Sequence, residues 1–158
     1  MSVQSHSFVS VSPDQTSDLA KRLGASLRPG DTLLLDGQVG AGKTHFARAV
    51  IQDLILTPED VPSPTYTLVQ TYDARVGEIW HADLYRLTDL SEIEELGLLQ
   101  AFEGAICLVE WPDRLHDLTP DNAMNIQFAQ GDAPDCRQIT FNWSNPRWTS
   151  IIEGLVDD

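Results

Sequence analysis

The stretch from Gly37 to Thr44 reads GQVGAGKT, and its spacing points directly to chemistry on phosphate groups. It matches the pattern G-x-x-x-x-G-K-[S/T] at every fixed position. Glycines let backbone N–H groups close around phosphate oxygens, the lysine reaches the β- and γ-phosphates, and the last hydroxyl group contacts Mg²⁺. We therefore predict a nucleotide-binding loop. Its expected binding residues are Gly37, Gly40, Ala41, Gly42, Lys43, Thr44 and the adjoining His45.

A phosphate-binding loop also needs a carboxylate for Mg²⁺, usually at the end of a neighbouring buried strand. Two candidates are Asp83, which ends EIWHAD, and Glu110, which ends AICLVE. Each is suited either to holding Mg²⁺ through water or to orienting the attacking water, and the sequence leaves the roles open. The guanine-reading pattern N-K-x-D is absent from the sequence, so ATP is the expected nucleotide.

The segment IWHADLYR, residues 79–86, collects several polar side chains at one place. Because side chains alternate along a strand, we expect His81, Asp83 and Tyr85 to share one face, with Arg86 on the other face or beyond. A single histidine in a strand is more often a hydrogen-bonded structural residue than a catalyst, and both interpretations of His81 stay open.

The surrounding elements predict one α/β domain over residues 1–158 with a mixed, mostly parallel central sheet. The apolar run TLLLD is typical of a strand buried on both faces, and Ser12 followed by Pro13 predicts the start of a helix. Expected strands are 7–11, 32–36, 66–73, 78–83, 105–111, 122–129 and 136–143. Expected helical segments are 12–27, 45–54, 88–97 (capped by Thr88 or Asp89 and ended by Gly97), 98–104, 112–118 and 146–155.

The composition limits the partners of the chain. Its net charge is −14, and Lys21 and Lys43 are its only lysines, so strong direct binding to nucleic acid is not expected. The acidity favours solubility or contact with a basic partner. Neither a transmembrane stretch nor a signal peptide is apparent, and Cys107 and Cys136 lack metal-type spacing. We expect a cytoplasmic protein without membrane contact.

Five motifs together resemble the TsaE family, also called YjeE. They are GQVGAGKT, SPTYTLV, HADLYR, EELG and VEWPDR, in this order, and the likeness extends from about residue 8 to about residue 142. Gln38 and Val39 stand where this family usually has an acidic residue and leucine, and neither position needs a side chain for phosphate binding.

The resemblance implies a P-loop NTPase fold and an ATPase that acts in forming threonylcarbamoyladenosine at position 37 of tRNA. It implies ATP and Mg²⁺ as cofactors and TsaD and TsaB as protein partners. Thr44 and Glu110 would hold Mg²⁺, Asp83 would complete the metal site, and Thr65 would face the γ-phosphate or the metal. The remaining nucleotide contacts implied by the resemblance are Thr16, Trp111 and Arg137. The expected catalytic set is Lys43, Thr65, Asp83 and Glu110.

Two other functions use the same loop. A small-molecule or nucleotide kinase would need an acceptor pocket and lid arginines, whereas the arginines of this chain are scattered along the sequence. A nucleotide-gated adaptor without useful hydrolysis would not need the full set of metal and water-positioning candidates. The partner-stimulated ATPase is therefore the preferred interpretation.

Overall fold

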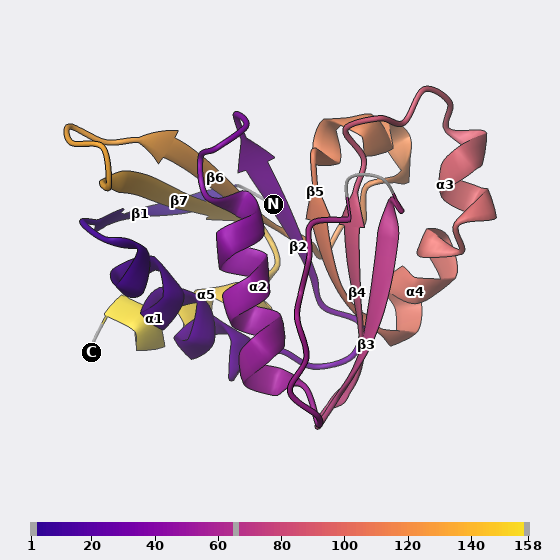
Figure 1. The fold of residues 1–158 in the computed structure, drawn as a ribbon, viewed down its shortest axis with the longest axis horizontal. Helices are drawn as coiled ribbons and strands as arrows, with labels where there is room; N and C mark the ends of the chain where they lie inside the picture. Colours follow the sequence, from indigo (N-terminus) through magenta and orange to yellow (C-terminus); the bar gives the residue numbers. More distant parts are fainter. Residues whose placement is uncertain (1–2, 65–66, 157–158) are drawn as a thin grey trace.

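The computed structural model describes residues 3–64 and 67–156, and its strands form a single mixed sheet (Figure 1). The sheet has seven strands in the order β1-β7-β6-β2-β5-β4-β3. Their bounds are β1 Gln4–Ser10, β2 Thr32–Gly37, β3 Val69–Ala74, β4 Gly77–Asp83, β5 Ile106–Glu110, β6 Met124–Gln130 and β7 Arg137–Trp143.

Parallel pairing is confined to the four central strands. β2 pairs in parallel with both β5 and β6, and β5 pairs in parallel with β4. Both edges are antiparallel, through the β3–β4 hairpin on one side and β1, β7 and β6 on the other. The predicted mixed α/β architecture is therefore confirmed. The register places Asp83 beside Glu110, at the carboxyl ends of two neighbouring parallel strands.

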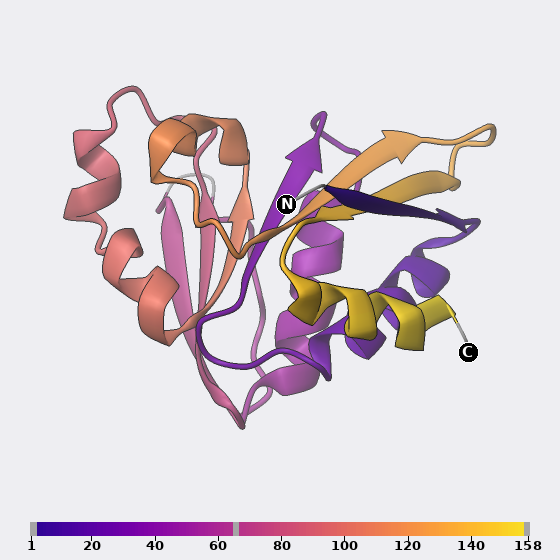
Figure 2. The ribbon, with the colours of Figure 1, turned by 180° about the vertical axis from the view of Figure 1, so that it is seen from behind.

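Helices cover both faces of the sheet (Figures 1 and 2). One apolar core joins the sheet to α1, α2 and α5, and a second joins its other face to α3, α4 and η1. In β2, Leu33 and Leu35 enter the first core while Leu34 enters the second, as expected for a strand buried on both faces. The helical bounds are α1 Pro13–Gly24, α2 Lys43–Leu54, α3 Ser91–Glu95, α4 Leu98–Gly104, the 3₁₀ helix η1 Pro112–Leu118 and α5 Pro146–Val156.

The predicted start of α1 is confirmed, whereas the predicted starts of α2 and α3 differ from the structure. The Ser12 hydroxyl accepts a hydrogen bond from the Gln15 N–H at 3.1 Å, and Pro13 opens α1. Neither Thr88 nor Asp89 is the N-cap of α3, because that position is Leu90. Asp89 instead accepts a hydrogen bond from the Ser91 N–H at 3.0 Å. Helix α2 begins two residues earlier than expected, inside the phosphate-binding motif.

The alternation expected for IWHADLYR extends only as far as Asp83. Strand β4 ends there, so Tyr85 lies beyond the strand with 48% of its surface exposed. Thr65 lies outside the described residues. Within the described ranges, no helix is both long enough and apolar enough to cross a membrane.

Candidate nucleotide site

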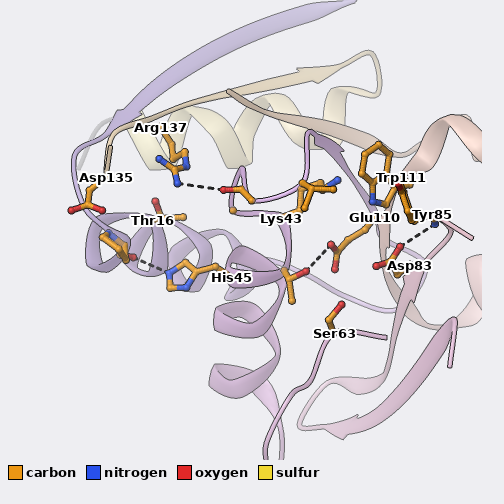
Figure 3. Close-up of a pocket in the computed structure, with 15 residues that line it drawn as sticks. Thr16, Lys43, His45, Ser63, Asp83, Tyr85, Glu110, Trp111, Asp135 and Arg137 are labelled. Atoms are coloured by element: carbon orange, nitrogen blue, oxygen red, sulfur yellow. Dashed lines mark hydrogen bonds between the residues drawn. The ribbon is translucent and has the colours of Figure 1, made fainter. Parts of the chain in front are cut away.

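A pocket of about 590 Å³ opens at the carboxyl ends of β2, β4 and β5 (Figure 3). Ligands of open α/β sheets bind at this edge, and the volume is in the range of small-molecule sites. Ten of the predicted site residues line the pocket: Thr16, Gly40, Gly42, Lys43, Thr44, His45, Asp83, Glu110, Trp111 and Arg137. Its other lining residues are Pro13, Val39, Ser63, Tyr85 and Asp135.

The loop between β2 and α2 adopts the backbone that its glycines permit. Gly40 and Gly42 have φ values of 81° and 110°, a region that residues with a Cβ atom rarely occupy. Gly42 is the N-cap of α2, so the first turn of that helix points its N–H groups toward the pocket edge. Such a helix start favours a bound anion.

Two predicted loop residues do not line the pocket but support it. The Gly37 carbonyl accepts a hydrogen bond from Lys43 Nζ at 2.6 Å. The Ala41 side chain belongs to the core, and the Ala41 carbonyl accepts a hydrogen bond from Arg137 Nε at 3.0 Å. Arg137 is in β7, so it ties a distant strand to the phosphate-binding loop.

The Lys43 side chain is more buried than a surface-loop lysine would be. It is 5% exposed, and Nζ lies 3.4 Å from the centroid of the Trp111 ring. Burial lowers the pKa of the Lys43 ammonium group, and the negative charges of Glu110 and Asp83 oppose that shift. The aliphatic stem and the charged end of Lys43 both pack against protein atoms in this structure.

Glu110 contacts a neighbouring side chain through each of its two carboxylate oxygens. Its Oε1 accepts a hydrogen bond from the Thr44 hydroxyl at 2.8 Å, and its Oε2 lies 2.7 Å from His81 Nε2. Glu110 is 2% exposed and His81 is fully buried. Because the Thr44 hydroxyl donates its proton, its lone pairs remain available to a cation next to Glu110 Oε1.

Asp83 lies at the end of β4, beside Glu110, and is 4% exposed. Its Oδ1 accepts a hydrogen bond from the Tyr85 N–H at 3.0 Å. The Tyr85 ring packs against Trp111 with 4.8 Å between centroids. Trp111 has a φ of 59°, an uncommon value for a bulky residue, and such strain tends to gather at functional sites.

The opposite side of the pocket is built from the starts of α1 and α2. His45 Nε2 donates a hydrogen bond to the Pro13 carbonyl at 3.0 Å and lies 2.9 Å from Ser17 Oγ. Thr16 is 3% exposed, and its hydroxyl lies 2.6 Å from Ser10 Oγ. The His45 contacts hold the starts of α1 and α2 together, and the Thr16 contact ties α1 to the end of β1.

The residues present fit Mg²⁺ brought in with phosphate, rather than a metal held by protein alone. Among the residues that the structure describes, no group of three or more His, Cys, Asp or Glu side chains could hold a metal ion. Mg²⁺ characteristically binds through one or two carboxylates, waters and substrate phosphates. The adjoining hydroxyl and carboxylate of Thr44 and Glu110 form such a partial donor set.

Sequence reasoning did not single out Pro13, Val39 or Asp135 as site residues. Pro13 carried a signal for a helix start, and Val39 lies inside the phosphate-binding motif, but neither pattern marks a pocket wall. Asp135 precedes β7 in a loop without a recognisable motif. Only the placement of β7 beside the loop before α2 brings Asp135 and Arg137 to the pocket.

Comparison with known proteins gave consistent matches. A family model described as Threonylcarbamoyl adenosine biosynthesis protein TsaE matches residues 10–139. A Rickettsia conorii protein named tRNA threonylcarbamoyladenosine biosynthesis protein TsaE is 40% identical over 148 residues, covering 92% of this chain and 85% of that protein. The Bacillus subtilis protein of the same name is 38% identical over 147 residues, covering 92% and 90% respectively.

The fold is also similar to a solved structure. The crystal structure of Bacillus subtilis YdiB superposes with a TM-score of 0.79 at 28% sequence identity, covering 99% of this chain and 97% of that one.

Proposed function

The chain belongs to the TsaE family of tRNA threonylcarbamoyladenosine biosynthesis proteins, and from this premise we propose that it is an ATPase of that process. In this proposal it binds ATP with Mg²⁺ and hydrolyses it in a complex with TsaD and TsaB, which sustains repeated turnover. The observation that carries the proposal is that Lys43, Thr44, Asp83 and Glu110 all line one pocket beside the phosphate-binding loop.

Binding begins at the loop and the start of α2. The N–H groups of this helix start receive phosphate oxygens, and Lys43 exchanges the Gly37 carbonyl for the β- and γ-phosphates. Thr44 and Glu110 are the residues that would hold Mg²⁺. When bound, Mg²⁺ supplies neutralisation of the charge that develops on the transferred phosphoryl group.

Asp83 is assigned to the attacking water. Asp83 is the second acid that lines the pocket, and it lies beside Glu110 at the carboxyl edge of the sheet. Asp83 would accept a hydrogen bond from water and orient the water oxygen toward the γ-phosphorus. A new P–O bond forms there as the bond to the β–γ bridging oxygen breaks, giving ADP and inorganic phosphate.

Hydrolysis by the chain alone should be slow. Among the described residues, no arginine lines the pocket except Arg137, which donates hydrogen bonds to the Ala41 and Cys136 carbonyls at 3.0 Å and 2.9 Å. A missing arginine finger can be worth about 10³–10⁵ in rate for phosphate-loop enzymes. A partner would therefore raise the rate by supplying a cation or by ordering the segments around the γ-phosphate.

The proposal is tested by phosphate release from γ-labelled ATP, with the chain alone, the TsaD–TsaB pair alone and all three together. We expect slow release by the chain and much faster release by the three together. Transfer of the label to a small molecule would favour a kinase instead. Absence of ATP binding by the chain would refute the ATPase assignment.

A further inference from the structure

His81 is a fully buried histidine whose imidazole forms a hydrogen bond with an acid of the nucleotide site. It lies two residues before Asp83 on β4, in register with Leu108 of β5. Its Nε2 atom is 2.7 Å from Glu110 Oε2. Glu110 therefore lines the pocket, whereas His81 lies behind it and does not line the pocket.

The direction of this hydrogen bond follows from its surroundings. A carboxylate only accepts hydrogen bonds, so His81 Nε2 carries the proton and donates it to Glu110. His81 Nδ1 is buried and has no hydrogen-bond partner among the residues that the structure describes. Within the described part of the chain, Glu110 is therefore the hydrogen-bond partner of this imidazole.

The two carboxylate oxygens of Glu110 therefore have different hydrogen-bond partners. Oε2 is held from behind by His81, and Oε1 is turned toward the Thr44 hydroxyl at the pocket. Rotation of the carboxylate would leave the His81 N–H buried without an acceptor, which commonly costs about 1–3 kcal/mol. The carboxylate is consequently held in one orientation before any cation arrives.

We infer that His81 is a positioning residue that fixes Glu110 so that one oxygen faces the Mg²⁺ carried by a nucleotide; this inference rests on the proposed function. Hydrogen-bond partners of metal ligands orient those ligands, and their loss typically costs about 10–100-fold in metal affinity or activity. A purely structural histidine would affect the stability of β4 without a selective effect on metal binding.

The test compares three variants of the full chain. His81→Leu keeps a similar volume but removes the donor. His81→Gln places an amide donor near the original Nε2 position, while the shorter His81→Asn cannot reach Glu110. Mn²⁺ affinity of the ADP complex is measured by electron paramagnetic resonance, and ADP affinity without metal is measured by calorimetry. Ile79→Val, on the same strand and fully buried, controls for loss of core packing.

We expect His81→Leu and His81→Asn to weaken Mn²⁺ binding by about 10–100-fold, with metal-free ADP affinity unchanged and His81→Gln close to the unmodified chain. Ile79→Val should leave Mn²⁺ binding unchanged. If His81→Leu does not fold, the Gln and Asn pair still decides between a donor effect and a packing effect. Equal Mn²⁺ affinity in both amide variants overturns the positioning role.

Failure of the inference is distinct from failure of the proposed function. If the unmodified chain binds ADP and Mn²⁺ and every folded His81 variant does the same, only the positioning role is overturned. If the unmodified chain binds no ADP, the ATPase assignment is overturned and the role of His81 falls with it.

Discussion

The ammonium group of Lys43 is held by the protein itself in this structure. It donates to the Gly37 carbonyl at 2.6 Å and lies above the Trp111 ring. A cation–π contact of this kind is worth about 0.5–2 kcal/mol, while desolvation of the ammonium group works in the opposite direction. Because the two effects oppose each other, we expect only a small net change in stability when this side chain is removed.

Lys43→Ala should therefore abolish most ATP affinity while changing the free energy of unfolding by no more than about 1 kcal/mol. Calorimetric titration with ATP and urea denaturation measure the two quantities. Lys21→Ala, which removes the only other lysine of the chain, is the matched control and should leave ATP affinity unchanged. ATP affinity that survives Lys43→Ala would contradict the phosphate-loop interpretation.

Asp83→Asn should lower partner-stimulated hydrolysis by about 10²–10³-fold and leave ATP affinity nearly unchanged, because the carboxylate acts where charge develops in the transition state. Steady-state phosphate release and calorimetry separate the two effects. Asp36→Asn removes the same charge from the neighbourhood of Lys43 without altering a pocket-lining residue. It should retain full activity, and equal losses in both variants would argue against a specific role for Asp83.

At the scale of elements, the site depends on how closely the phosphate-binding loop approaches strand β6. A Cβ atom added at Gly37 would lie 2.7 Å from the Phe128 carbonyl oxygen. Gly37 pairs with Phe128 across the parallel β2–β6 ladder, so neither backbone can move alone. The end of β2 therefore requires glycine for close packing as well as for loop conformation.

Gly37→Ala should destabilise the fold by about 1–3 kcal/mol, the usual cost of overpacking, and should also weaken ATP binding by shifting the backbone of the phosphate-binding loop. Thermal unfolding and calorimetry report the two losses. The matched control is Gly104→Ala at the end of α4, where an added Cβ meets no atom within 4 Å among the described residues. That control should be neutral or slightly stabilising; equal stability of the two variants would contradict the clash.

At the scale of the whole molecule, the two cysteines differ in burial and therefore in expected reactivity. Cys107 is fully buried in β5, and burial raises the pKa of its thiol to about 12. Cys136 is partly exposed in the loop before β7. The thiolate is the form that reacts with labelling reagents. Cys107 is therefore protected from labelling both by its burial in the sheet and by the raised pKa of its thiol.

Thiol labelling near neutral pH should therefore modify Cys136 quickly and Cys107 only at the rate of global opening. Mass spectrometry of the intact chain would show one modification early and two after denaturation. Cys136→Ser, which should remove the fast phase alone, serves as the control. Rapid labelling of Cys107 in the native chain would contradict the burial of β5.

The net charge of −14 also acts on the molecule as a whole. It attracts a basic partner face over long range, and salt shortens that range from about 10 Å at 0.1 M to about 3 Å at 1 M. Association with the TsaD–TsaB pair, measured by surface plasmon resonance, should become slower as salt rises. Salt-independent association would show that the acidity serves solubility alone.

Much of the fold and part of the site followed from local patterns in the sequence. The motif GQVGAGKT predicted the strand–loop–helix unit because glycine, lysine and threonine each have a role set by their spacing. Apolar runs predicted the buried strands, and Ser12 with Pro13 predicted the start of α1. These features depend on neighbouring residues, so the sequence alone determined them.

Contacts between distant segments were decided by the tertiary structure. The order of strands places β4 beside β5 and thereby brings His81 to Glu110, while β7 carries Arg137 to the loop before α2. The burial of Lys43 likewise depends on Trp111, which follows a different strand. The spacing of apolar residues in the sequence cannot predict these contacts between distant segments. Strand order and side-chain packing arise only when the whole sheet assembles.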